Sequence, residues 1–456
     1  MQTQANVFKA YDLRGVYGRD FDDELAYKLG LAYYQWRQRE LKTDRQLAIV
    51  IGHDMRLSSP ALHEALTKGL LAAGAQILDI GLSSTPTFYF ATAKLAADGG
   101  IMVSASHNPQ EYNGFKIVRD RAKPVGENSG LFELRDLVLQ TELLPAAVEG
   151  SYQLVENIVD QQIEHDLALM GDLSLQPLKI VMDPANAMGG PYFERLFAKF
   201  PQLSLIRMNW SLDGSFPGHE ADPFKPENIQ PLSQMVIGQQ ADLGIATDGD
   251  ADRIFFVDNL GQPLEPGIVR AIMAKLFLAE KPGAKIAYDI RPGKITEDTI
   301  VSNGGQPVVA RVGHSLIKAT MLEQDVYFAG ESSGHFFLNM ADGCYEVPGI
   351  IALKLITALT ASGQTLAEFI APYKKYYHSG EINRRVIDPA AKIKAIAEHY
   401  ADGQPNFLDG VTITYPDFWF NVRASNTEPL LRLNLEASSP EIMAAKRDEI
   451  LALIAS

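Results

Sequence analysis

The sequence predicts an α/β protein built from three related α/β domains and a smaller C-terminal α+β domain. Its 456 residues exceed what one hydrophobic core usually serves, so several domains are expected. A buried strand, a polar turn and an amphipathic helix follow one another three times along the chain. The last part instead contains closely spaced strand patterns and ends in a helix pattern.

The first of these strand–helix patterns begins at residues 47–52, an apolar run that ends before Asp54 and Arg56. A helix should follow, with Ser59 as its N-cap, Pro60 at its first position and Gly74 at its end. Leucines at 62, 66 and 70 would lie on one face of this helix, and residues 77–80 form the next predicted strand.

The pattern recurs at residues 178–183 with a helix near 191–200, and at 285–289 with a helix at 295–303. The irregular spacing favours related domains over a solenoid. We therefore expect domains at 1–150, 151–258, 259–370 and 371–456. In the last domain, the predicted elements are strands at 381–387, 411–415, 419–422 and 431–436 and a helix at 440–455.

Three carboxylates, Asp248, Asp250 and Asp252, stand at alternate positions between two apolar runs. Converging negative charges repel one another, and a hard divalent cation with oxygen ligands offsets that repulsion. Mg²⁺ fits best because it leaves coordination positions open for a phosphate. An EF-hand loop would need Gly and Glu where the chain has Arg253 and Asn259. An aspartyl-phosphate nucleophile or a solvated acidic turn would also account for the pattern.

A second polar loop follows the apolar run 100–103 and brings a hydroxyl, an imidazole and an ammonium close together in sequence. Ser106 is the candidate carrier of a phosphoryl group, because loops at strand ends of α/β sheets collect ligands. His107 and Lys116 could orient or neutralise that group. Taken alone, the segment could equally be an ordinary polar turn.

Two further loops offer ligand-binding groups. Glu331 and Ser333 follow a short apolar run and suit neighbouring sugar hydroxyls. Arg423 is followed by hydroxyl and amide side chains that match the oxygens of a phosphate. These side chains are Ser425, Asn426 and Thr427. Neither loop is specific alone, since each could be a turn.

Together and in this order, the segments SASHNP, DGDADR, GESSGH and RASNTEP closely resemble the α-D-phosphohexomutase superfamily, and within it the bacterial phosphomannomutase/phosphoglucomutase branch. The resemblance covers essentially the whole chain. The opening segment FKAYDLRG is similar to the one that supplies Tyr11 and Arg14 to the site in this family. The implied fold has four domains around a central cleft, with one loop from each.

The resemblance also implies a reaction: reversible conversion of mannose 6-phosphate and mannose 1-phosphate. Phosphorylated Ser106 would face Mg²⁺ held by the three aspartates, and Ser106 itself would complete the metal site. Hexose 1,6-bisphosphate would be the intermediate and activator. Arg253 would help to hold the transferring phosphoryl group.

Candidates for proton transfer are His107, Lys116, Arg253, Arg291 and His314, although Arg291 is a poor base at neutral pH. Substrate binding would use Tyr11, Arg14, Glu331, Ser333, Arg423, Ser425, Asn426 and Thr427.

Two positions favour a hexose over a glucosamine substrate: Asn426 and Phe115 stand where the phosphoglucosamine branch typically has glycine and isoleucine. No residue clearly reads C2, where mannose and glucose differ, so activity on glucose phosphates is expected as well. A phosphoglucomutase and a phosphoglucosamine mutase are the closest competing interpretations. A phosphatase, or a non-catalytic sugar-phosphate-binding protein, would belong to a different class.

Composition agrees with a large cytosolic enzyme, and its acidity requires any anionic substrate to meet a local cluster of cations. Lys plus Arg total 41 against 56 Asp plus Glu, a net charge of −15, which argues against a nucleic-acid partner. The single Cys344 excludes an internal disulfide framework and is expected to pack in a core. We find no apolar signal region and no uncharged stretch of the ~20 residues that cross a bilayer. We expect no membrane partner, a cytoplasmic location, and a monomer or small homo-oligomer.

Overall fold

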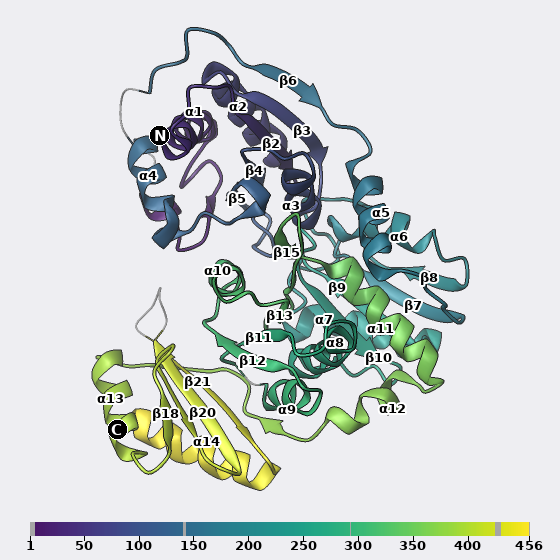
Figure 1. The fold of residues 1–456 in the computed structure, drawn as a ribbon. Coiled ribbons are helices and arrows are strands. Elements are labelled where there is room, and N and C mark those ends of the chain that lie inside the picture. Colours follow the sequence, from purple (N-terminus) through teal and green to yellow (C-terminus); the bar gives the residue numbers. More distant parts are fainter. Residues whose placement is uncertain (1–4, 140–142, 292, 425–429, 456) are drawn as a thin grey trace. The chain divides into compact units, whose positions relative to one another are not determined.

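The structure is a computed structural model that describes residues 5–139, 143–291, 293–424 and 430–455. The chain divides into two compact units (Figure 1). The first unit contains Met1–Leu264 and Ser333–Ala367, and the second contains Glu265–Ser332 and Glu368–Ser456. Ser425, Asn426 and Thr427 of the predicted phosphate loop lie outside the described residues.

The N-terminal part of the first unit is a six-stranded sheet in the order β1-β5-β4-β2-β3-β6. Its parallel centre, β4-β2-β3, is extended by the antiparallel strands β5 and β1. The strands are β1 (Leu13–Val16), β2 (Ala48–His53), β3 (Gln76–Leu82), β4 (Gly99–Val103), β5 (Tyr112–Arg119) and β6 (Ser151–Leu154). The helices are α1 (Asp23–Leu41), α2 (Ser59–Ala72), α3 (Thr85–Lys94) and α4 (Leu131–Leu139), with the short η1 (Ala5–Val7), η2 (Asp120–Ala122) and η3 (Glu127–Ser129).

Alternate residues of the central strands pack on opposite faces of this sheet. Ile49 and Ile51 of β2 join a core that includes Leu29 of α1 and Leu66 of α2. On the other face, the backbone of β4 lies close to Phe88 of α3. This two-sided burial explains why the predicted strand is continuously apolar.

The rest of the first unit contains a second sheet in the order β10-β9-β7-β8 and an antiparallel pair, β14 and β15. The strands are β7 (Leu178–Asp183), β8 (Leu203–Arg207), β9 (Leu243–Thr247), β10 (Ile254–Asp258), β14 (Phe336–Asn339) and β15 (Cys344–Glu346). The helices are α5 (Ile158–Met170), α6 (Gly189–Phe197), α7 (Pro226–Gln239) and α11 (Pro348–Ser362). Cys344 is buried, as expected.

The second unit begins with three parallel strands in the order β12-β11-β13. These are β11 (Lys285–Asp289), β12 (Gln306–Ala310) and β13 (Phe328–Gly330), with helices α8 (Pro266–Glu280), α9 (Lys294–Ser302) and α10 (His314–Gln324). Short helical turns, α12 (Leu366–Ile370) and η4 (Ala371–Tyr373), lead toward the C-terminal region.

The C-terminal region is a sheet in the order β16-β21-β20-β19-β18, with β17 also paired to β21. One face packs against the two helices (Figure 1), in a core that includes Phe420, Leu433, Ile396 and Ile450. The strands are β16 (Tyr377–His378), β17 (Ile382–Arg385), β18 (Gln404–Asn406), β19 (Val411–Thr414), β20 (Phe418–Ala424) and β21 (Leu430–Ala437), and the helices are α13 (Pro389–His399) and α14 (Pro440–Ala455).

The predicted α/β class with a C-terminal α+β region is therefore confirmed. One local prediction is wrong. Ser59 is the first residue of α2, and Ser58 occupies the N-cap position without a side-chain capping bond. The Ser59 hydroxyl instead donates to Asp54 Oδ1 at 2.5 Å.

Among the described residues, no single helix has both the length and the apolar character needed to cross a bilayer. The sharply bent pair Pro348–Ser362 and Leu366–Tyr373 meets the length and composition criteria only when its two helices are taken together.

Candidate active site

The acidic loop joins β9 to β10, and its three aspartates converge. Asp248, Asp250 and Asp252 are at most 2% exposed. One oxygen from each lies within 4.8 Å of the others. Ala251, in the left-handed region at φ +60°, turns the loop between the last two carboxylates. The alternation read from the sequence therefore produces a single cluster of buried negative charge.

Lys116 of β5 partly neutralises this cluster. Its Nζ lies 2.5 Å from both Asp250 Oδ2 and Asp252 Oδ2. Burial lowers the pKa of Lys116, but these two carboxylates outweigh that effect and raise it well above its usual value. Burial raises the pKa of Asp252, but Lys116 and His335 outweigh this and lower it well below its usual value. Burial, together with its two fellow aspartates, raises the pKa of Asp248.

The residues present fit a hard metal ion. Asp250 Oδ1 is buried and has no hydrogen-bond partner among the described residues. An unpaired carboxylate oxygen in such a position is costly unless a cation or water meets it. The three aspartates offer only oxygen atoms, which suits Mg²⁺ better than a soft transition metal.

Ser106 sits directly beside this cluster. Its hydroxyl donates to Asp248 Oδ2 at 2.7 Å and lies 3.2 Å from His107 Nδ1. Its backbone is in the left-handed region at φ +50°, a strained conformation for a serine. Gly249 permits this approach, because a Cβ there would lie 2.3 Å from the Ser106 carbonyl oxygen.

Arg56 holds the Ser106 loop in this conformation. Its fully buried guanidinium donates to four backbone carbonyls at 2.6–3.0 Å, those of Ser106, Asn108, Pro109 and Tyr112. Asp54, at 3.3 Å from Arg56 Nε, balances its charge. Arg56 therefore fixes the backbone on both sides of the loop apex, although it does not reach the serine hydroxyl itself.

Cationic groups surround the serine and the metal cluster. Arg14 donates to Asn108 Oδ1 at 2.5 Å and to the Ala105 carbonyl at 3.1 Å. Arg253 Nε lies 3.7 Å from Asp248 Oδ2. Burial, with the positive charges of Arg253 and Arg14, lowers the pKa of His107 well below its usual value. These surroundings favour the uncharged form of the His107 imidazole and make it a weaker base than a free histidine.

The segment from Ser333 to His335 adds a further histidine to this site. His335 Nε2 lies 3.2 Å from Asp252 Oδ1, and its Nδ1 lies 2.8 Å from the Ser333 hydroxyl. The backbone NH of Ile254 donates to Gly334 O at 3.0 Å. The first unit thus brings together Ser106, His107, Lys116, the three aspartates, Arg253, Arg14 and Ser333.

In the second unit, Asp289 is the centre of a buried network that contains Arg291. Arg291 Nε donates to Asp289 Oδ2 at 2.5 Å, and its Nη2 lies 3.2 Å from Glu331 Oε1. Glu331 also accepts the backbone NH of Gly313 at 3.0 Å. Arg291 and Glu331, predicted from separate segments, are therefore ion-paired.

Arg423, at the end of β20, is paired with a carboxylate that the sequence did not single out. Its Nη2 lies 2.5 Å from Glu381 Oε2, and Glu381 also pairs with Arg432 at 3.1 Å. Burial raises the pKa of Glu381, but the two arginines outweigh this and lower it. The guanidinium of Arg423 is thus held in a fixed position at the loop that the sequence predicts to bind phosphate.

Two more predicted site residues lie at the starts of elements. Tyr11 is half-buried just before β1, and His314 is the half-buried first residue of α10.

Sequence reasoning missed Arg56, Thr85, His335 and Glu381. Thr85, for example, donates to Asp250 Oδ2 at 2.5 Å from the start of α3. Only His335 carried a sequence signal, since it ends the predicted sugar loop.

Comparisons with known proteins agree with this geometry. Sequence models of the phosphoglucomutase/phosphomannomutase family match the chain in four places: α/β/α domain I at residues 5–141, domain II at 160–261, domain III at 266–376 and the C-terminal domain at 381–453.

Individual relatives match over the full chain. A phosphomannomutase from Salmonella montevideo is 38% identical over 460 residues, covering 98% of this chain and 99% of its own. A protein of Xanthomonas campestris named "Phosphohexose mutases" is 37% identical and covers 97% of each chain. Among solved structures, a phosphoglucomutase/phosphomannomutase family protein from Burkholderia thailandensis has a TM-score of 0.88 at 31% identity, covering 99% of this chain and 97% of its own. With four matched domains, full-length relatives and a serine set against an acidic triad, the chain belongs to the phosphoglucomutase/phosphomannomutase family of phosphohexomutases.

Proposed function

We propose that this hexose-phosphate mutase interconverts mannose 6-phosphate and mannose 1-phosphate through phosphorylated Ser106 and a hexose 1,6-bisphosphate. We propose that it also acts on glucose phosphates. The observation that carries the proposal is the 2.7 Å contact between the Ser106 hydroxyl and Asp248 in a buried acidic triad. Full-length relatives named phosphomannomutase support mannose as the main substrate.

In the proposed reaction, the phosphorus–oxygen bond to Ser106 breaks while a new one forms to the free sugar hydroxyl. The hydroxyl proton passes to a base, and the serine oxygen is left to be rephosphorylated. After the bisphosphate turns around, its other phosphoryl group returns to Ser106, so no net phosphate is consumed. The bisphosphate also serves as activator, because it phosphorylates an enzyme whose Ser106 is free.

Mg²⁺ held by Asp248, Asp250, Asp252 and an oxygen on Ser106 would supply Lewis-acid stabilisation of the charge on the serine oxygen. Lys116 stays protonated beside Asp250 and Asp252 and keeps the cluster from carrying its full charge. Arg253, close to Asp248, would hold the equatorial phosphoryl oxygens.

We propose His107 as one proton carrier, because its Nδ1 lies 3.2 Å from the Ser106 oxygen. Arg291 cannot fill that role, since it is an ion-paired guanidinium. We assign it to holding Glu331. His314 and Lys116 stay as alternative proton carriers.

Substrate binding is proposed for the remaining predicted residues. We propose that Glu331 and Ser333 bind neighbouring sugar hydroxyls, and that Tyr11 and Arg14 contribute from the opening segment. Arg423, with Ser425, Asn426 and Thr427, would bind the phosphate that is not being transferred. We propose a monomer or small homo-oligomer whose partners are small hexose phosphates.

The test is side-by-side turnover of mannose 1-phosphate, glucose 1-phosphate and glucosamine 1-phosphate by the wild type and by Ser106→Ala. We expect measurable turnover of the first two, much less of the third, and no turnover by the variant. Mass spectrometry should find phosphate on Ser106 of the wild type. A preference for glucose or glucosamine phosphate would instead identify a phosphoglucomutase or phosphoglucosamine mutase. Release of inorganic phosphate would indicate a phosphatase, and binding without turnover a sugar-phosphate-binding protein.

A further inference from the structure

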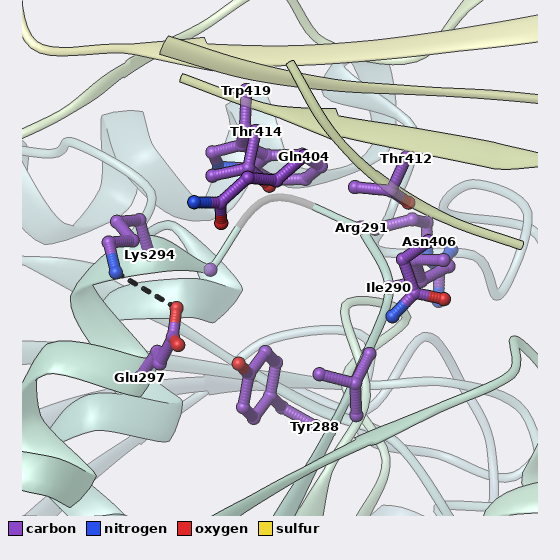
Figure 2. A pocket seen from close by; sticks show the side chains of 12 residues that line it. Tyr288, Ile290, Arg291, Lys294, Glu297, Gln404, Asn406, Thr412, Thr414 and Trp419 are labelled. Atoms are coloured by element: carbon purple, nitrogen blue, oxygen red, sulfur yellow. Dashed lines mark hydrogen bonds and ion pairs between the residues drawn. The ribbon is translucent and has the colours of Figure 1, made fainter. Parts of the chain in front are cut away.

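The second unit contains a cavity of about 380 Å³ that the proposed reaction does not use (Figure 2). One wall is formed by the end of β11 and the start of α9, and the other by strands β18, β19 and β20 of the C-terminal sheet. Its volume is at the lower end of the range for small-molecule sites, which suits a ligand of one or two rings. Among the described residues that are assigned to the reaction, Arg291 alone lines the cavity.

The sheet wall presents a row of polar and aromatic side chains. Gln404, Thr414 and Trp419 are direct neighbours across three antiparallel strands. Their neighbours along the chain, such as Ile413 and Phe420, point to the opposite face and are buried in the core. In Figure 2, the Gln404 amide points into the cavity from this wall, and the Tyr288 hydroxyl faces it from the other.

Several of these groups are available to a ligand. The side chains of Gln404 and Thr414 form no hydrogen bond with the residues that the structure describes. Trp419, by contrast, is fixed. Its Nε1 donates to Glu436 Oε2 at 2.8 Å, and the same oxygen accepts the backbone NH of Lys294 at 2.9 Å. Glu436 is only 5% exposed, and it ties the two walls together.

The charges around the cavity are already balanced. Lys294 lies 3.0 Å from Glu297 and 3.2 Å from Asp298. Arg291 is paired with Asp289 and Glu331. No cation among the described lining residues is therefore left over for a phosphate, and what the walls offer is an indole face, an amide and a hydroxyl. These groups suit the apolar face and the hydroxyls of an uncharged sugar ring.

We propose that this cavity is a second carbohydrate site, which binds an uncharged pyranose stacked on Trp419 and hydrogen-bonded to Gln404 and Thr414. It differs in chemistry from the proposed reaction site, which must bind phosphate. Because Arg291 lies at the cavity and also pairs with Glu331, the second site directly adjoins the proposed sugar-binding carboxylate.

The probe is methyl α-D-mannopyranoside, which lacks a phosphate and has a blocked anomeric oxygen, so it cannot be turned over. Binding to the full chain is measured by calorimetry and by the change in tryptophan fluorescence. We expect saturable binding in the millimolar range. The double variant Gln404→Ala/Thr414→Ala should weaken it about tenfold or more, because two hydrogen bonds are lost.

Two control variants test whether the glycoside binds at this cavity and not elsewhere on the protein. Gln324→Ala removes an exposed amide at the end of α10, away from the cavity lining, and should bind as the wild type does. Glu331→Gln alters the proposed reaction site and should also retain binding. The proposal is overturned by absence of saturable binding, by equal binding in the double variant, or by loss of binding in Glu331→Gln alone. Tighter binding of adenosine monophosphate than of the glycoside would overturn it too, since that ligand is anionic.

Discussion

Arg56 shows how a residue can position the proposed reacting serine without contacting its hydroxyl. The strained backbone of Ser106 persists only if surrounding contacts determine it, and the four carbonyls held by Arg56 are such contacts. A lysine keeps the charge but cannot donate to four carbonyls from one planar group. The position of the serine oxygen thus depends on the guanidinium geometry.

We therefore expect Arg56→Lys to lower kcat by about 100-fold, the effect of roughly a 1 Å displacement of a reacting group, while KM changes little. Steady-state kinetics with a hexose 1-phosphate measures both constants. Added guanidinium should partly restore kcat to Arg56→Ala, which a loss of folding alone would not allow. An unchanged kcat in Arg56→Lys would show that the loop holds its conformation without this residue.

Lys116 is expected to matter for stability as well as for chemistry. Lys116→Met leaves buried Asp250 and Asp252 without their counter-charge, which typically costs about 3–5 kcal/mol. Thermal unfolding in a chelating buffer should show a clearly lowered midpoint, and Mg²⁺ should recover part of the loss because it binds the folded site.

The matched control for Lys116 is Lys68→Met, which removes a solvent-exposed pair with Glu64 and should leave the unfolding midpoint almost unchanged, because water screens such pairs. Equal midpoints for Lys116→Met and the wild type in chelating buffer would contradict the view that Lys116 compensates the acidic cluster.

At the scale of single residues, the sequence predicted the charged groups that converge in the structure, but not the groups that position them. The three aspartates could be recognised because alternate carboxylates at a strand end have few other uses. Arg56 and Glu381 could not be recognised, because their partners lie far away in sequence. Arg56 donates to carbonyls about 50 residues later in the chain, and Glu381 pairs with an arginine 42 residues later. A buried arginine that binds backbone carbonyls leaves no pattern in the chain.

Among the elements, helices α1 and α2 make an unusually close contact through two glycines. A Cβ on Gly69 would lie 2.1 Å from the carbonyl oxygen of Tyr27, and one on Gly30 would lie 2.7 Å from that of Leu66. The helices approach each other through backbone atoms that cannot move aside. Gly69→Ala should therefore cost about 1–3 kcal/mol through overpacking, despite the better helix propensity of alanine.

Denaturant unfolding provides the measurement, and Gly238→Ala provides the control. Gly238 lies in α7, and a methyl group added there would have no neighbouring atom within 4 Å among the described residues. This change should therefore stabilise by about 0.5–1 kcal/mol. If both variants were more stable than the wild type, helix propensity rather than packing would decide the outcome at Gly69.

Element prediction succeeded where the apolar pattern was continuous and failed at short, exposed elements. The strands β7 and β11 and the helix α14 have the predicted bounds. The three-residue strand β18 contains Pro405 and is exposed throughout, so it lacked the alternation that identifies a strand. Helix α13 begins with the start signals Asp388 and Pro389. Ile396 is its one buried residue, so the helix lacks a clear apolar face that would identify it in the sequence.

At the scale of the whole molecule, His219 should make the free energy of unfolding depend on pH, with a direction that follows from its pKa shift. Burial lowers the pKa of His219, but its hydrogen bonds to Asp183 and to the Glu220 carbonyl outweigh this and raise it. A raised folded-state pKa stabilises the fold when the histidine is protonated. That contribution is complete below the unfolded value of about 6.5 and is lost as pH rises through the folded value.

His219→Gln should accordingly destabilise the protein most near pH 6 and progressively less toward about pH 8. The difference in denaturant midpoint between variant and wild type, measured across this range, gives the sign directly. A difference that grows with pH would mean that neutral His219 is the stabilising form.

The four-domain plan was accessible to sequence because each domain carries its own strand–helix pattern and its own polar loop. The division into two compact units could not be predicted from the sequence, because each unit consists of two separate segments of the chain. The first unit includes Ser333–Ala367, which follows a segment of the second unit along the chain. No local pattern marks Ser333 as returning to the fold begun at the N-terminus.

This discontinuity has a consequence for synthesis on the ribosome. The acidic loop and Ser106 emerge before Leu264, but His335, which contacts Asp252, belongs to a segment that ends at Ala367. At about 5–20 residues per second, the 103 residues from 264 to 367 take roughly 5–20 s to appear. For the first part of that interval, until His335 and the strands β14 and β15 have been synthesised, the nascent chain has the acidic loop and Ser106 without the segment that completes their unit. A translational pause after Ala367 should therefore yield a folded first unit, whereas a pause at Leu264 should yield a chain that needs chaperones.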